Sequence, residues 1–272
     1  MPPASGASGA LRAVQPIASP CLAAKNCLLK VITPEVRVAR EAYRPASAAA
    51  QRETTGSNRP ISGTQSLHLE RNSTMSKVIA IMSMSLDGYV ADTNDGVAEV
   101  FDWYFNSGDV EFHAGGSDSM TFKVSEPSAM HLRSLWFELG AALTGRRTFD
   151  VAQGWGGNHG WGPAFVLTHD IPDGWPRPNS TVHFVTDGLE SAVNQAKAGA
   201  AGKSVGVHGA DTIRQLLNAG LLDEIHIDLA AVLLGSGVRL FDNLSGTPAV
   251  LGNPDVIQGV GVTHLRYSVL AG

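Results

Sequence analysis

Strand-like and helix-like segments alternate along residues 75–272, and this alternation predicts an α/β fold. Short apolar runs rich in β-branched residues predict the strands, and longer amphipathic runs predict the helices between them. Because strands joined through helices pair in parallel, we expect a mostly parallel sheet with helices on both faces. Residues 256–270 resemble a closing antiparallel pair, which adds antiparallel strands at the C-terminal edge of the sheet.

The first predicted strand is KVIAIMSMS (77–85), and the turn signal Asp87-Gly88 ends it. A helix is expected over 127–139, where apolar residues recur at helical spacing and Pro127 suits the first turn. Further strands are expected at 141–145, 165–169, 181–185, 203–209 and 224–234.

Two more helices are expected between the later strands. LESAVNQAKA (189–198) follows Asp187, whose side chain is predicted to cap the helix. ADTIRQLLNAG (210–220) comes directly after a strand and closes at Gly220.

Length, composition and charge exclude several classes of protein. The chain has 272 residues, enough for one large domain or two small ones. Its 43% hydrophobic and 17% charged residues fit a soluble globular enzyme, and its net charge of −5 argues against electrostatic binding of nucleic acid or an anionic membrane. No apolar run approaches the roughly 20 residues that span a bilayer. Both cysteines, Cys21 and Cys27, precede the predicted domain, so we expect no thiol chemistry there and a cytoplasmic location.

Residues 1–74 differ from the rest of the chain. They are rich in Ala, Ser, Pro and Arg and show no sustained period, which predicts a low-complexity, disordered extension. A transit peptide would be acid-poor, whereas Glu35, Glu41 and Glu53 occur here; a functional disordered tail is a second alternative. We favour a simple upstream extension, because MSKVIAIMSMS at Met75 resembles a protein start, and we expect one domain over 75–272.

Several common motifs are absent or incomplete. Gly202-Lys203-Ser204 lacks the earlier glycine of a phosphate-binding P-loop, and no G-x-G-x-x-G follows the first strand. No H-E-x-x-H or G-x-S-x-G occurs either. The histidines are scattered, and we expect surface or core roles for those at 113, 131 and 183 and no metal site.

Four segments that each follow a predicted strand carry the chemistry. They are SLDGYVA (85–91), GRRT (145–148), LTH (167–169) and VHGAD (207–211). Ligands of open α/β sheets bind outside the carboxyl ends of the strands, so these segments predict one nucleotide site. The two arginines of GRRT suit a ligand with separate phosphates, because guanidinium groups bind phosphate through a planar pair of donors.

Together with LLDEIHIDLAAVLLGSGVRLF (221–241), these motifs resemble the dihydrofolate reductase superfamily, and within it the reductase domain of bifunctional riboflavin-biosynthesis deaminase-reductases. The likeness covers about residues 77–270. It implies a dihydrofolate-reductase-like fold, NADPH as cofactor, a small-molecule substrate and a homodimer.

The resemblance also implies which residues bind the cofactor. Val90 and Ala91 would offer backbone groups to the nicotinamide carboxamide, and Thr168 and His169 would lie beside the adenosine 2′-phosphate. The phosphates would be held by Gly145, Arg146, Arg147 and Thr148 and, at a helix N-terminus, by Gly209, Ala210, Asp211 and Thr212.

Each assignment has a plainer alternative. Arg147 could pair with a surface acid, and Asp87 is expected to bond backbone in its turn. His169 and His208 could be strand-end residues without ligand contact. GWGGNHGWGP (154–163) could be a mobile loop or could cover a ligand with its tryptophans.

The chain also departs from its relatives. Ala129 stands where dihydrofolate reductases place the carboxylate that holds the pterin, and residues 1–74 contain no zinc-deaminase motif. We therefore expect a stand-alone NADPH-dependent reductase that passes hydride to a C=O or C=N carbon of a heterocyclic or sugar-phosphate substrate, similar to 5-amino-6-(5-phosphoribosylamino)uracil reductase. Pterin reduction and a non-catalytic nucleotide-binding module are the alternatives. Asp228 is the candidate substrate contact or proton relay, with a buried structural carboxylate as its alternative.

Overall fold

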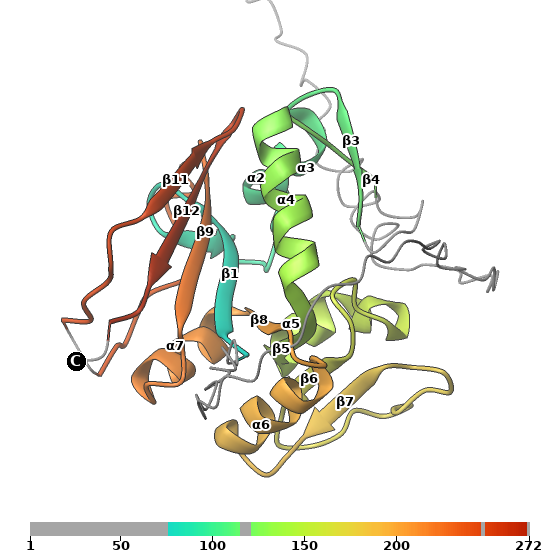
Figure 1. Ribbon diagram of the computed structural model, residues 1–272. Helices are drawn as coiled ribbons and strands as arrows, with labels where there is room; N and C mark the ends of the chain where they lie inside the picture. Colours follow the sequence, from blue (N-terminus) through green and yellow to red (C-terminus); the bar gives the residue numbers. More distant parts are fainter. Residues whose placement is uncertain (1–75, 115–120, 246–247, 271–272) are drawn as a thin grey trace, which may run out of the picture.

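The computed structural model describes residues 76–114, 121–245 and 248–270 (Figure 1). The predicted N-terminal extension lies outside the described residues, so its disorder and the domain boundary near Met75 stay predictions. In the described part of the chain, no helix is long and apolar enough to span a bilayer.

One sheet of eight strands forms the centre of the described structure, in the order β11-β12-β9-β1-β8-β5-β6-β7. Neighbours from β9 to β7 pair in parallel, whereas β12 pairs antiparallel with both β9 and β11. This confirms the predicted mostly parallel sheet with antiparallel strands at its C-terminal edge. The strands are β1 (Val78–Ser85), β5 (Leu139–Gly145), β6 (Ala164–Leu167), β7 (Val182–Val185), β8 (Ser204–His208), β9 (Glu224–Ala230), β11 (Asp255–Gln258) and β12 (Val262–Ser268).

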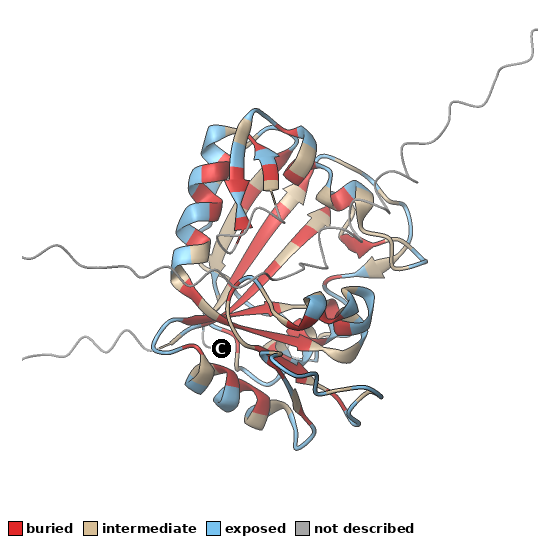
Figure 2. Ribbon diagram, turned by 90° about the vertical axis from the view of Figure 1, so that its right-hand side faces the viewer, coloured by how far each residue is buried: buried red, intermediate tan, exposed pale blue. Residues whose placement is uncertain are grey.

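Helices cover both faces of the sheet. Residues of α6 and α7 pack on one face, and residues of α4 and α5 pack on the other. In Figure 2 the buried residues concentrate on the central strands, while exposed residues lie on the outer sides of the helices. The helices are α2 (Ala98–Phe101), α3 (Trp103–Asn106), α4 (Glu126–Glu138), α5 (Arg146–Val151), α6 (Leu189–Gly199), α7 (Ala210–Asn218) and the 3₁₀ turn η2 (Gln153–Gly157).

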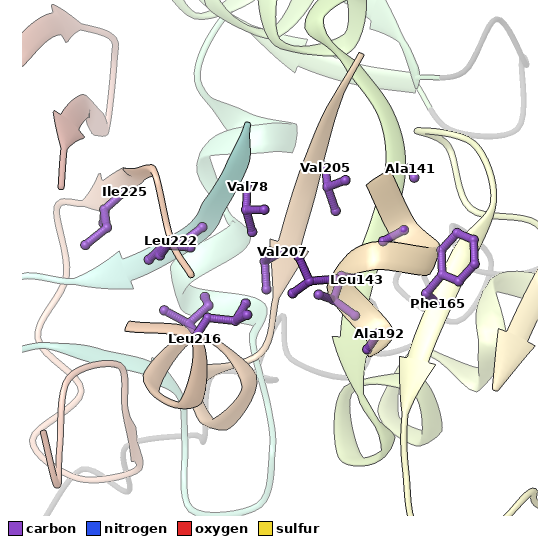
Figure 3. Packing of buried hydrophobic residues seen from close by; sticks show 14 of the residues in the cluster. Val78, Ala141, Leu143, Phe165, Ala192, Val205, Val207, Leu216, Leu222 and Ile225 are labelled. Atoms are coloured by element: carbon purple, nitrogen blue, oxygen red, sulfur yellow. The ribbon is translucent and has the colours of Figure 1, made fainter. Parts of the chain in front are cut away.

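Alternation along β1 explains why both faces are filled. Val78 and Ala80 belong to the cluster beneath α6 and α7, and Ile79 and Ile81 belong to the cluster beneath α4. Figure 3 shows Val78 beside Val205 and Val207 of β8 in the first cluster. Because β1 is buried on both faces, its sequence is a nearly continuous apolar run, and this run is what predicted the strand.

Two small antiparallel pairs complete the structure: β2 (Tyr89–Ala91) with β10 (Val238–Arg239), and β3 (Val110–His113) with β4 (Thr121–Val124). The first pair joins the SLDGYVA segment to the LLGSGVRLF segment. The Asp87 carboxylate strengthens this junction by accepting hydrogen bonds from the backbone N–H groups of Leu234 (3.1 Å) and Gly235 (2.7 Å). Asp87 thus bonds backbone, as its D-G turn predicted.

The structure corrects two local predictions. Strand β9 ends at Ala230 rather than at residue 234, because the next residues turn away to bond the Asp87 segment. Asp187 does not cap α6 through its side chain; it accepts a hydrogen bond from Ser191 Oγ instead (2.8 Å), and Gly188 occupies the cap position.

Candidate functional site

A cavity of about 930 Å³ opens at the carboxyl ends of β1, β5, β6 and β8. This is the sheet edge at which open α/β folds bind their ligands. Every residue assigned to the cofactor by resemblance lines this cavity: Val90, Ala91, Gly145, Arg146, Arg147, Thr148, Thr168, His169, Gly209, Ala210, Asp211 and Thr212. The four sequence segments therefore meet in space as predicted.

Two strand-to-helix turns interlock at the floor of the cavity. A Cβ atom on Gly209 would lie 2.5 Å from Thr148 Oγ1, and one on Gly145 would lie 2.8 Å from Thr212 Oγ1. Gly209 also has φ +92°, a backbone conformation that side-chain-bearing residues rarely adopt. The missing side chains let the N-terminus of α7 approach the β5–α5 turn, which brings free backbone amides together.

The two arginines of the β5–α5 turn are already paired with carboxylates. Arg146 Nε lies 2.9 Å from a carboxylate oxygen of Asp150, and its Nη1 lies 3.4 Å from Asp170. Arg147 Nη2 lies 2.6 Å from Asp95 Oδ1, so the surface-pairing alternative for this residue is present in the structure. A phosphate would have to share or replace these acidic partners.

A third arginine lines the cavity and was missed by sequence reasoning. Arg214 lies on α7 and contacts Asp211 through an i,i+3 pair at 3.3 Å. Arg214 comes three or four residues after the predicted phosphate-binding residues Ala210 and Asp211. Because residues at this spacing share a helix face, the sequence could have indicated that Arg214 also faces the cavity.

Two histidines and a tryptophan form the middle of the cavity. His208 lies 3.1 Å, through Nδ1, from the backbone oxygen of Ile81, and its ring stacks on Trp161 with centroids 4.2 Å apart. His159 contacts the same indole at 4.9 Å. Burial lowers the pKa of His208 to about 4 and that of His159 well below its usual value, so both rings are neutral at pH 7. His208 lines the cavity, and so does Trp161, which belongs to the segment GWGGNHGWGP (154–163).

Beyond these rings the cavity is walled by aromatic side chains from α2, α3, β4 and α4. Tyr104 and Phe122 have ring centroids 4.6 Å apart, Phe105 and Phe122 5.7 Å, and Phe122 and Trp136 6.4 Å. Sequence reasoning missed this wall. The run FDWYF (101–105) was the signal, since three of its aromatic residues line the cavity.

Asp228 lies behind this wall rather than in it. It is 3% exposed and is not among the residues that line the cavity. Burial by itself would raise its pKa, but hydrogen bonds and charge interactions with His131 and His264 outweigh burial and lower it. The pKa of Tyr104 is raised well above its usual value by burial and then by the charge of Asp228. Tyr104 thus separates the carboxylate from the cavity.

The neighbours of Asp228 form a buried cluster whose ligand atoms lie within 4.8 Å of one another: Asp228, His131 and His264. His264 Nδ1 is 2.6 Å from Asp228 Oδ1, and His131 Nε2 is 3.5 Å from it. Arg266 Nη2 lies 3.0 Å from His131 Nδ1, and a guanidinium can only donate. The proton of neutral His131 is therefore on Nε2, which faces Asp228 at 3.5 Å, too far for a well-formed hydrogen bond. A protonated nitrogen cannot bind a metal ion, which argues against a metal centre at these residues.

Comparison with known proteins gives one family match. Residues 165–263 match the family model of the RibD C-terminal domain. Curated proteins give no sequence match to this chain.

Solved structures resemble the described fold. A protein assigned to riboflavin biosynthesis from Shewanella sp. PV-4 has 23% identity and a TM-score of 0.50, and the match covers 72% of this chain and 99% of that one. The deaminase/5-amino-6-(5-phosphoribosylamino)uracil reductase of Thermotoga maritima has 11% identity and a TM-score of 0.47, covering 72% of this chain and 57% of that one. Dihydrofolate reductase from Enterococcus faecalis, complexed with NADP(H), has 12% identity and a TM-score of 0.42, covering 72% and 98%. The family match therefore supports the resemblance to the reductase domain of riboflavin-biosynthesis proteins over residues 165–263, and the Shewanella structure shows a likeness of fold alone.

Proposed function

We propose that this protein is an NADPH-dependent reductase of a small heterocyclic or sugar-phosphate substrate. The observation that carries the proposal is the single cavity lined by every residue that the resemblance assigned to the cofactor. When bound, the nicotinamide group would supply a hydride to a C=O or C=N carbon of the substrate.

The residues present fit such a cofactor. The interlocked Gly145 and Gly209 turns leave out two side chains that would otherwise fill the space between β5 and β8. Amides at the N-terminus of α7 and the guanidinium groups of Arg146 and Arg147 are donors suited to phosphate oxygens. Val90 and Ala91 are buried at the other side of the same cavity, where β10 fixes their backbone.

The reduction also needs one proton. His208 donates through Nδ1 to the Ile81 backbone oxygen, and its lowered pKa keeps it neutral, so its Nε2 can only accept a hydrogen bond. The Trp161 backbone N–H donates to His159 Nδ1, so neutral His159 carries its proton on Nε2, and we propose that this group orients the water that supplies the proton. Asp228 does not reach the cavity. We therefore propose an indirect role for it, as a carboxylate that positions and polarises Tyr104.

Titration of NADPH and NADH tests the cofactor assignment. Removing a charged hydrogen bond to phosphate costs roughly 1.5–3 kcal/mol, which is about a 10- to 150-fold loss of affinity. We expect Arg146→Ala or Arg147→Ala to narrow the preference for NADPH over NADH, because only NADPH carries the 2′-phosphate. Arg133→Ala is the matched control, since Arg133 pairs with Glu126 at the surface and does not line the cavity. An unchanged preference in both variants would contradict the assignment.

The alternative from another class is a nucleotide-binding module without catalysis. NADPH oxidation measured across pyrimidine, pterin and carbonyl substrates separates it from a reductase. Pterin reduction gains no support from the structure, because Ala129 is fully buried and does not line the cavity. The homodimer and the cytoplasmic location stay predictions.

A further inference from the structure

The cations that line the described cavity gather on α5 and α7. They are Arg146, Arg147 and Arg214, each paired with a carboxylate. Arg147 pairs with Asp95, which lies in the segment before α2. The cavity therefore has one end suited to phosphate, and the proposed cofactor occupies that end.

The opposite end is built from rings. We call this the aromatic end, formed by Phe101, Tyr104, Phe105, Phe122 and Trp136 together with Trp161. The rings touch in sequence, since Phe122 contacts Trp136 and Trp136 contacts Trp161 at 5.8 Å. Figure 1 shows the supporting elements α3, β3 and β4 grouped beside α4, away from α7.

Within the described residues, no lysine or arginine lines the cavity at its aromatic end; Arg133 and Lys203 share a second hollow with Trp136 and Trp161 but do not line this cavity. His159 and His208, which border this end, are neutral because burial lowers their pKa. Behind the wall lies the carboxylate of Asp228, held between His131 and His264, and Arg266 contacts His131 on its other side.

These features oppose a phosphate group and favour a flat ring. A phosphate placed here would lose its hydration without a cationic partner among the residues that line this end. A planar uncharged compound would instead stack against several rings and bury apolar surface. We propose that the substrate of this protein is a planar, uncharged aromatic compound rather than a phosphorylated sugar derivative. This inference rests on the proposed reductase function, because it assumes that the cofactor fills the arginine end.

Binding of 1-naphthol and 1-naphthyl phosphate, measured by isothermal titration calorimetry in saturating NADP⁺, tests the inference. The two probes share one ring system and differ by the phosphate. We expect 1-naphthol to bind at least about tenfold more tightly, since an unpaired buried charge costs several times RT. Equal or tighter binding of 1-naphthyl phosphate, or no binding of 1-naphthol, would overturn the inference.

A charge added to the wall should reverse the preference. Phe105→Lys places an ammonium group at the aromatic end, and we expect it to raise the affinity for 1-naphthyl phosphate about tenfold. Phe137→Lys adds the same charge on α4, but Phe137 is 80% exposed and does not line the cavity, so it should change nothing. An equal gain in both variants would contradict a site at the aromatic end. If Phe105→Lys does not fold, the wild-type comparison of the two probes still decides.

The test of the substrate class and the test of the proposed reductase function can be told apart. Titration of NADP⁺ alone reports on the arginine end, and titration of 1-naphthol without NADP⁺ reports on the aromatic end. Binding of 1-naphthol without any binding of NADP⁺ would refute the reductase and leave an aromatic-binding site. Binding of NADP⁺ with a preference for the phosphorylated probe would refute the substrate class alone.

Discussion

Replacing Gly209 with alanine should damage both stability and cofactor binding. The new methyl group would lie 2.5 Å from Thr148 Oγ1, and the backbone would be held at φ +92°. The strained backbone costs about 1–3 kcal/mol, and overpacking adds roughly 1–3 kcal/mol. We therefore expect a loss near 3 kcal/mol, which lowers Tm by roughly 6–12 °C in a domain of this size.

Two further variants separate the contributions. Gly202 has φ +84° but open space around its would-be Cβ, so Gly202→Ala tests the backbone cost alone. Thr148→Ala in the Gly209→Ala background removes the clashing hydroxyl and should recover part of the loss. Thermal unfolding by circular dichroism and NADP⁺ titration are the measurements. If Gly209→Ala costs no more than Gly202→Ala and binds NADP⁺ normally, the interlocked turns do not form the phosphate site.

Three other changes test other parts of the site. The folded pKa values of His159 and His208 lie below the unfolded value of about 6.5, so stability should fall as pH drops from about 6.5 towards 4. His208→Gln should remove about 2 kcal/mol of this loss at pH 5, measured in urea melts. Asp228→Asn should lower kcat roughly 100-fold with unchanged NADPH affinity, whereas a purely structural carboxylate would change only Tm. NADPH binding should quench the fluorescence of Trp161, and a Trp161→Phe variant that quenches equally would place the nicotinamide elsewhere.

The strands and the arginine end of the cavity could be predicted because their signals are local. Apolar runs such as VIAIMSMS are long enough to show their period, and parallel topology brings strand ends together without further information. The family resemblance then implied cofactor roles for residues such as Arg146 and Gly209, and these roles stay predictions.

The aromatic end was not predicted, because its helices α2 and α3 have only four residues each and show no period, which leaves the aromatic run FDWYF as its local signal. The surroundings of Asp228 were hidden for a different reason. Its partner His264 comes thirty-six positions later and faces it only through the β9–β12 register, while His131 arrives from α4. Nothing in the local pattern EIHIDLA distinguishes a carboxylate that faces a ligand from one that faces two histidines.

The place of β1 in the sheet has a consequence for how the chain folds as it is made. The first strand lies between β8 and β9, whose residues begin at Ser204 and Glu224, so both of its hydrogen-bonding partners leave the ribosome only after most of the chain has been made. Until then β1 exposes an apolar run with two unpaired edges, the form of nascent chain that aggregates most readily. High contact order of this kind slows folding, because a long loop must close before any pairing is gained. The centre of the sheet therefore cannot assemble until most of the chain has been made.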